Sequence, residues 1–132
     1  MSMSENDALG KATDSSTDGN KSVLTKFESK HGLLCTFKTD ELTALCPFDF
    51  GGPDYYNLTI KYETQDYTVE SKSLKKWLQG YRETEISAEE LAHEIHDTVT
   101  DCVSPTQCYV CLEQARRGGI EETVEVGHVS LK

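Results

Sequence analysis

Apolar and polar residues alternate in four segments of the chain, and this alternation predicts β-strands. The segments 33–37 and 55–63 are rich in aromatic and β-branched residues, which fit a pleated, half-buried surface. The segments 107–114 and 120–126 have the same character and are joined by Arg116-Arg117-Gly118-Gly119, a sequence suited to a tight hairpin turn. The pattern therefore predicts two pairs of strands.

The middle of the chain changes to a helical period. After Ser71, apolar residues recur three and four positions apart, at Leu74, Trp77, Leu78 and Tyr81. Ser87 and Glu90 form a capping-box pattern before a second helix, which ends at about Cys102 and has an apolar stripe of Leu91, Ile95 and Val99. The order ββααββ predicts an α+β fold, an antiparallel four-stranded sheet with two helices on one face.

The N-terminal residues have a different composition. Residues 1–22 are almost all small or polar, so we expect a disordered tail there and a single domain over residues 23–132. Val23, Leu24 and Phe27 are apolar, but their spacing is too short to assign an element.

Composition limits the function classes. The formal net charge of −10 argues against a general nucleic-acid-binding surface. No apolar run approaches the roughly 18 residues that a membrane helix needs, and no signal peptide is recognisable. We therefore expect a cytoplasmic protein with no membrane partner, in which the five cysteines stay reduced.

Two of these cysteines, Cys108 and Cys111, have the Cys-x-x-Cys spacing of metal and redox motifs. They lie in a predicted strand, where residues three apart point to opposite faces, and no second pair completes a zinc site. We interpret them as packing residues and predict no metal site.

Another thiol, Cys46, occurs in a chemically distinctive context. It lies in a loop after the apolar residues Leu42 and Leu45, in Cys46-Pro47, and the Gly51-Gly52-Pro53 turn places Asp54 at the start of the next strand. A thiol and a carboxylate on one loop suit nucleophilic attack with proton transfer. Taken alone, Cys46 also fits a small buried residue, and Asp54 a turn former.

Four motifs together carry a family resemblance: CPFDFGGPD, VESKSLKKW, the helix start at Glu89, and RRGGI. Over about residues 40–126 the chain resembles the short, single-module 7-cyano-7-deazaguanine reductases, the nitrile reductases of the queuosine pathway. The resemblance implies a tunnelling fold (T-fold), whose sheets join side by side into barrels. It also implies a homo-oligomer with active sites at subunit interfaces.

The resemblance implies a role for each matched residue. Cys46 matches the nucleophile that adds to the nitrile of the small-molecule substrate to give a thioimide, and Asp54 matches the acid. NADPH would then supply hydride in two rounds, yielding the aminomethyl product. Substrate-binding positions of the family fall on Val69, Glu70, Ser71 and Glu89. Cations suited to the NADPH phosphates are Lys72, Lys75 and Arg117. A solvated basic face, and an acid at a helix start for Glu89, remain the simpler alternatives.

The chain departs from the family pattern at two places. Residues 48–52 replace the usual segment with its Thr and Gln, and are one residue longer. Ser87-Ala88-Glu89 stands where the family has Phe-His-Glu, so its histidine is absent. Asp49, His93 and His96 are candidates to replace it.

Two alternatives stay open. A sister group uses the same Cys and Asp on a 7-cyano-7-deazaguanine already in tRNA and forms archaeosine with ammonia, so nucleic acid would be the partner. The other alternative is a T-fold protein that binds a purine or pterin without turnover. The retained ESKSLK and RRGG motifs favour the reductase.

Overall fold

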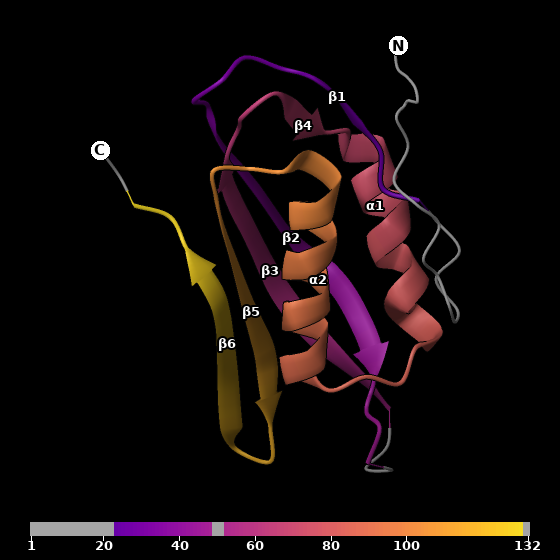
Figure 1. The fold of residues 1–132 in the computed structure, drawn as a ribbon. Helices are drawn as coiled ribbons and strands as arrows, with labels where there is room; N and C mark the ends of the chain where they lie inside the picture. The colour runs from indigo at the N-terminus through magenta and orange to yellow at the C-terminus, as the bar shows by residue number, and fades with distance from the viewer. Residues whose placement is uncertain (1–22, 49–51, 131–132) are drawn as a thin grey trace.

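The computed structural model describes residues 23–48 and 52–130, and the predicted tail lies outside them. The elements are β1 (Lys26–Glu28), β2 (Leu34–Leu45), β3 (Pro53–Glu63), β4 (Tyr67–Val69), α1 (Ser71–Gln79), the 3₁₀ turn η1 (Gly80–Glu83), α2 (Ala88–Val103), β5 (Gln107–Arg117) and β6 (Ile120–His128). Figure 1 shows α1 and α2 on the same face of the main sheet. The predicted α+β architecture is confirmed.

The main sheet has the order β2-β3-β5-β6, and every neighbouring pair is antiparallel. The strands are longer than their sequence pattern predicts. β2 contains one extra residue between Thr39 and Leu42, and β5 contains one between Gln114 and Arg117. Each of these β-bulges interrupts the alternation without ending the strand, because pairing resumes beyond it.

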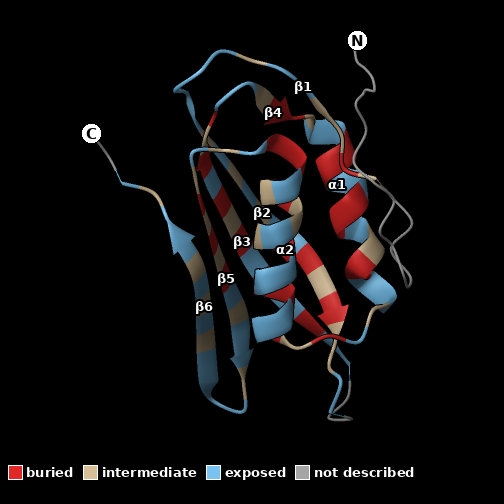
Figure 2. Ribbon diagram, in the orientation of Figure 1, coloured by how far each residue is buried: buried red, intermediate tan, exposed pale blue. Residues whose placement is uncertain are grey.

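The core lies between the helices and the helix-facing side of the sheet, as the buried residues in Figure 2 show. On β3, the side chains of Tyr56, Leu58, Ile60 and Tyr62 point to this side and are buried. The predicted helix stripes supply the opposite wall, with Leu74, Trp77 and Leu78 of α1 and Leu91, Ile95 and Val99 of α2. The period of each pattern therefore identified the buried face correctly.

Both helices begin at a capping side chain. The Ser87 hydroxyl accepts the Glu90 backbone N–H at 3.2 Å, which confirms the predicted start of α2. The Glu70 carboxylate caps α1 by accepting the backbone N–H groups of Lys72 and Ser73. α2 ends at Val103, after which Ser104 adopts a left-handed conformation ahead of Pro105.

A small second sheet was not predicted. β1 pairs with β4 in antiparallel register, from Lys26 opposite Val69 to Glu28 opposite Tyr67. Leu24, just before β1, is buried in the core. Three-residue strands are too short to show a period, so only the tertiary contact defines them.

Cys108 and Cys111, the two cysteines of the Cys-x-x-Cys spacing, point to opposite faces of β5, as residues three apart in a strand should. Cys108 is buried on the helix-facing side of β5, where burial raises the pKa of its thiol. Cys111 is half-buried and lies on the opposite face. No cluster of three or more metal-ligating side chains occurs within residues 23–48 and 52–130. Over the same ranges, no helix is long and apolar enough to span a membrane.

Candidate functional site

Cys46 and Asp54 belong to one end of the main sheet. Asp54 pairs with Ala44 across β2 and β3, and Cys46 follows Ala44 by two residues, directly after β2 ends. Without the β2 bulge, the odd-numbered residues of the strand would continue to face the helices. The bulge shifts this alternation, so that Leu42 and Ala44 are buried beneath the helices and Cys46 is next in that series.

Arg117 is the ion-pair partner of Asp54. Asp54 is only 5% exposed, so its carboxylate requires a partner of opposite charge. The β5 bulge places Arg117, opposite Ile120, on the helix-facing side of the sheet that Asp54 also occupies. Gly118 and Gly119, both with positive φ, then form the tight turn into β6.

The Cys46 thiol is partly accessible and has a backbone donor nearby. The residue is half-buried, and the Phe48 backbone N–H points to its sulfur at 3.4 Å. Pro47 has no N–H, so Phe48 supplies the first backbone donor after the cysteine. The thiol is therefore held at a loop start, open to a reactant. Asp49, the next candidate in this loop, lies outside the described residues.

Glu89 and Glu122 form a carboxyl pair at the same end of the sheet. Glu89 lies in the first turn of α2, and Glu122 projects from β6 opposite Gln114. Their mutual hydrogen bond lowers the pKa of Glu89 and, with burial, raises the pKa of Glu122 to about 7. Below about pH 7 the pair therefore shares one proton, with Glu122 as the donor and Glu89 as the ionised acceptor.

Tyr56 is a buried tyrosine of β3 whose pKa responds to all of these groups. Burial, followed by the charges of Asp54, Glu122, Cys46 and Glu89, raises its pKa well above the ordinary value. Those charges act on the hydroxyl only because all four groups are close to it. The structure thus brings the predicted residues Cys46, Asp54, Glu89 and Arg117 together around a tyrosine.

Tyr56 and Glu122 were not predicted from the sequence as site residues. Tyr56 was identifiable, because it follows Asp54 by two residues in a strand and therefore lies on the same face. Glu122 was not, because its place beside Glu89 depends on the register of β6 against β5 and on the packing of α2. A hairpin sequence does not show which helix its face will meet.

The predicted substrate residues Val69, Glu70 and Ser71 lie at the opposite end of the sheet. The Val69 N–H donates to the Tyr62 hydroxyl, and Tyr62 is eight residues along β3 from Asp54. At about 3.3 Å per residue this is a separation of about 26 Å. One chain therefore carries two groups of predicted site residues and does not bring them into contact.

Lys72 and Lys75 are exposed on α1. Lys75 borders a groove of about 200 Å³ between α1 and the β2 side of the sheet. Phe37, Leu42, Leu58, Ile60, Leu74 and Leu78 form its apolar lining, and its polar residues include Lys38, Thr39, Glu41, Ser71 and Gln79. Arg117 does not join these lysines within one chain, because it pairs with Asp54.

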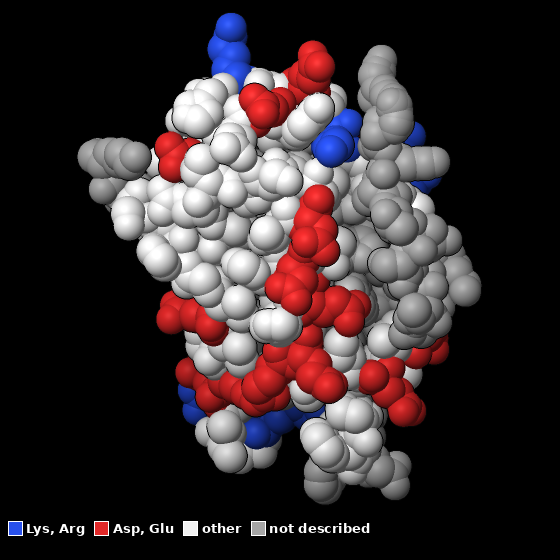
Figure 3. Space-filling model, in the orientation of Figure 1, with Lys and Arg blue, Asp and Glu red and all other residues white. Residues whose placement is uncertain are grey.

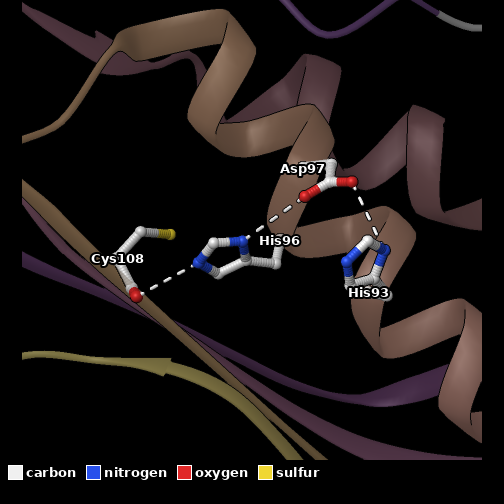
Figure 4. A network of polar contacts seen from close by, with 4 residues as sticks. All are labelled: His93, His96, Asp97 and Cys108. Atoms are coloured by element: carbon white, nitrogen blue, oxygen red, sulfur yellow. Dashed lines mark hydrogen bonds and ion pairs between the residues drawn. The ribbon is translucent and has the colours of Figure 1, made fainter.

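The two histidines predicted as replacements for the missing one both lie on α2. His96 contacts the Cys108 carbonyl oxygen through Nε2 at 3.2 Å, and Asp97 lies within 4 Å of both imidazoles (Figure 4). Cys108 is paired with Tyr62, at the end of β3 away from Asp54. His96 therefore does not lie beside Cys46 of the same chain. His93 is exposed on α2, one helical turn after Glu89, and stays a prediction.

Comparison with known proteins places this geometry in context. Residues 53–132 match the family described as "QueF-like protein". A relative from Syntrophus aciditrophicus, named NADPH-dependent 7-cyano-7-deazaguanine reductase, is 37% identical over 77% of this chain and 74% of its own. A relative of the same name from Chlorobium chlorochromatii is 32% identical over 82% of this chain and 95% of its own.

One solved structure has the same fold. The crystal structure of the archaeosine synthase QueF-Like in the apo form superposes with a TM-score of 0.69 at 24% identity. The match covers 78% of this chain and 100% of that one. At this identity the likeness establishes the shared fold and leaves the reaction to be argued from the site.

Proposed function

The chain belongs to the QueF-like protein family, and from this premise we propose that it reduces the nitrile of 7-cyano-7-deazaguanine to an aminomethyl group with NADPH. The observation that carries the proposal is the position of Cys46 beside a buried, ion-paired Asp54, at the end of the sheet that also holds Glu89. A nucleophile, a proton carrier and an acceptor for the base are the three groups that this reaction requires.

In the proposed first step the Cys46 sulfur adds to the nitrile carbon. A C–S bond forms, one π bond of the nitrile breaks, and its electron pair takes a proton at nitrogen. The thiol itself supplies this proton, which Asp54 accepts as a carboxylate and passes to the nitrogen. The step is therefore balanced without any external acid, and Arg117 stabilises the carboxylate before the transfer.

Glu89 is proposed to bind the N–H edge of the base. An ionised carboxylate accepts two N–H groups side by side, which matches the ring N–H and amino group of a guanine-type base. Because Glu122 has the higher pKa, it carries the shared proton and Glu89 carries the negative charge. The carboxyl pair thus carries one negative charge toward a neutral base instead of two.

NADPH supplies hydride when bound, and the groove beside α1 fits part of such a cofactor. Its apolar lining suits a ring system, while Lys38 and Lys75 lie at its border and Lys72 is exposed one helical turn before Lys75. These cations suit phosphate groups. We assign phosphate binding to Lys72 and Lys75, and charge stabilisation at the Cys46 end to Arg117.

The separation of Cys46 from Glu70 supports a homo-oligomer with active sites between subunits. Within the described residues the main sheet ends at β2 and β6, so a strand of a second copy can add at either edge. We propose that Val69, Glu70 and Ser71 of one copy complete the Cys46 site of another. Glu70 already holds the helix α1 N-terminus, which fixes the orientation of its carboxylate.

Subunit complementation tests this arrangement. Cys46→Ala and Glu70→Gln homo-oligomers are each expected to be inactive. Mixing them under conditions of subunit exchange should restore part of the activity, because some interfaces then combine an intact Cys46 with an intact Glu70. Mixed oligomers that stay inactive would place both residues in one subunit's site and contradict the shared interface.

The charge distribution favours the free base over a nucleic-acid substrate. Figure 3 shows acidic side chains along the middle of the face that carries α2 and gathered near its lower end. The exposed acids of α2 are Glu89, Glu90, Glu94, Asp97 and Asp101. Such a surface repels a polyanion. The archaeosine-forming alternative therefore requires another face for its tRNA.

An NADPH-oxidation assay with the free base tests the proposed function. We expect base-dependent loss of NADPH in the wild type and none in Cys46→Ala. Ammonia-dependent amidine formation on tRNA, without any loss of NADPH, would replace the reductase with the sister activity. If the protein binds the base but catalyses neither reaction, the result would support the alternative of a T-fold protein that binds its ligand without turnover.

A further inference from the structure

The hydroxyl of Tyr56 is a buried polar group without a partner. The residue is only 2% exposed, and its hydroxyl oxygen makes no hydrogen bond among the residues that the structure describes. Buried hydroxyls in folded proteins nearly always have a hydrogen-bond partner, because leaving one unpaired is unfavourable. Phenylalanine would fill the same space without an unpaired hydroxyl, so a tyrosine here indicates that the missing partner is a ligand.

The neighbours of this hydroxyl fix what it can do. Cys46 follows β2, Asp54 lies two residues before Tyr56 on β3, and Glu122, the partner of Glu89, lies on β6. Tyr56, Gln114 and Glu122 are paired in one row across β3, β5 and β6. Burial among these acidic groups raises the pKa of Tyr56. The hydroxyl therefore keeps its proton at neutral pH and acts as a hydrogen-bond donor.

The proposed substrate presents an acceptor at the matching position. In 7-cyano-7-deazaguanine the carbonyl oxygen of the six-membered ring lies between the nitrile and the ring N–H. A base held by Cys46 at its nitrile and by Glu89 at its N–H edge thus directs this carbonyl between the two groups. Tyr56 lies on β3, between the strand that Cys46 follows and the strand of Glu122, the partner of Glu89.

We propose that Tyr56 is a specificity-determining residue, whose hydroxyl donates a hydrogen bond to the ring carbonyl of the bound base. The inference rests on the proposed function, since it assumes a base held between Cys46 and Glu89. It adds a third recognition contact to the two ends of the substrate. The site would then select an oxo-substituted base over one with a donor or no substituent at that position, because an unsuitable base leaves the hydroxyl unpaired.

Tyr56→Phe is the direct test, with Tyr55→Phe as the matched control. Tyr55 also loses one hydroxyl, but it is exposed on the opposite face of β3. For Tyr56→Phe we expect KM for 7-cyano-7-deazaguanine, and the concentration for half-maximal thioimide formation, to rise about tenfold. Tyr55→Phe should match the wild type in both measurements.

A second substrate separates recognition from a structural effect. The 6-thio analogue keeps the nitrile and the N–H edge but replaces the carbonyl oxygen with sulfur, a weaker acceptor. The ratio of wild-type to Tyr56→Phe affinity should therefore fall from about ten toward about one. The melting temperature of unliganded Tyr56→Phe should equal or exceed that of the wild type, because the variant removes an unpaired buried hydroxyl.

Each other outcome overturns the inference. Equal affinity loss for both substrates, or a lower melting temperature, would make Tyr56 a structural residue. If the wild type forms the thioimide but Tyr56→Phe has the same KM as the wild type, the hydrogen bond to the base does not exist. The proposed function would then be unaffected. A wild type that neither binds nor reacts with the base would overturn the contact and the function together.

Discussion

The carboxyl pair of Glu89 and Glu122 predicts an unusual dependence of stability on pH. Glu122 has its pKa raised to about 7 in the folded protein by the hydrogen bond to Glu89 and by burial, against an ordinary value of 4.5. Between these values the folded protein holds a proton that the unfolded chain releases. The free energy of unfolding from this group is therefore highest at low pH and falls as pH rises toward 7.

Glu89 contributes in the opposite direction. Its pKa is lowered in the folded protein, so its contribution is present above 4.5 and is lost as the pH falls below that value. The pair is thus most favourable to folding near pH 5, and the loss toward pH 7.5 belongs to Glu122. Across this interval the full effect would be about 3 kcal/mol, at about 1.4 kcal/mol per pH unit. Partial exposure of the pair reduces our expectation to about 1–2 kcal/mol.

Glu122→Gln removes the titration and keeps a donor toward Glu89, since the amide N–H replaces the carboxylic O–H. Between pH 5 and 7.5 the free energy of unfolding of the variant should fall by about 1–2 kcal/mol less than that of the wild type. The variant should also be the more stable protein at pH 7.5. Urea denaturation at both pH values, at one protein concentration, measures the difference. Glu113→Gln removes an exposed carboxylate from the neighbouring strand and controls for net charge. Parallel pH profiles of the wild type and Glu122→Gln would refute the shared proton.

Two substitutions test the backbone and the buried ion pair. Gly127 has φ +76, and an added Cβ would lie 2.2 Å from a backbone oxygen of β5, so Gly127→Ala should lower the free energy of unfolding by about 3 kcal/mol. Gly119→Ala, also at positive φ but in open space, should lower it by only about 1 kcal/mol, and equal losses in urea denaturation would contradict the steric argument. Arg117→Met leaves Asp54 buried without this cation and should lower it by about 2 kcal/mol, a value reduced for the part-exposed arginine. Arg116→Met breaks an exposed pair and should change it by less than about 0.5 kcal/mol, so similar losses in both would show that Asp54 does not need Arg117.

The sequence predicted the elements well because their periods are long and regular. Eleven residues of alternation in β3, and fourfold spacing through α2, each specify one buried face. The β1 and β4 strands have three residues each, and no period can be read from them. Their pairing follows from where the chain enters and leaves the larger elements.

The site was predicted less completely, for reasons that lie in the sheet register. The sequence pattern identified Cys46 and Asp54, but it did not show the two bulges. The β2 bulge places Leu42, Ala44 and the position of Cys46 on the helix-facing side of the sheet. The β5 bulge does the same for Arg117. A shift of one residue exchanges the two faces of a strand, so Arg117 could not be distinguished from Arg116 as the partner of Asp54. The sequence therefore did not predict the ion pair of Arg117 with Asp54.

Intact-protein mass spectrometry tests the central claim, the covalent use of Cys46. After incubation with 7-cyano-7-deazaguanine, the wild type and Cys111→Ala should gain the mass of the base, and Cys46→Ala should not. Addition of NADPH should discharge the adduct as reduction proceeds. An adduct that persists in Cys46→Ala, or a wild type that never acquires the mass, would contradict the assignment of Cys46 as the nucleophile.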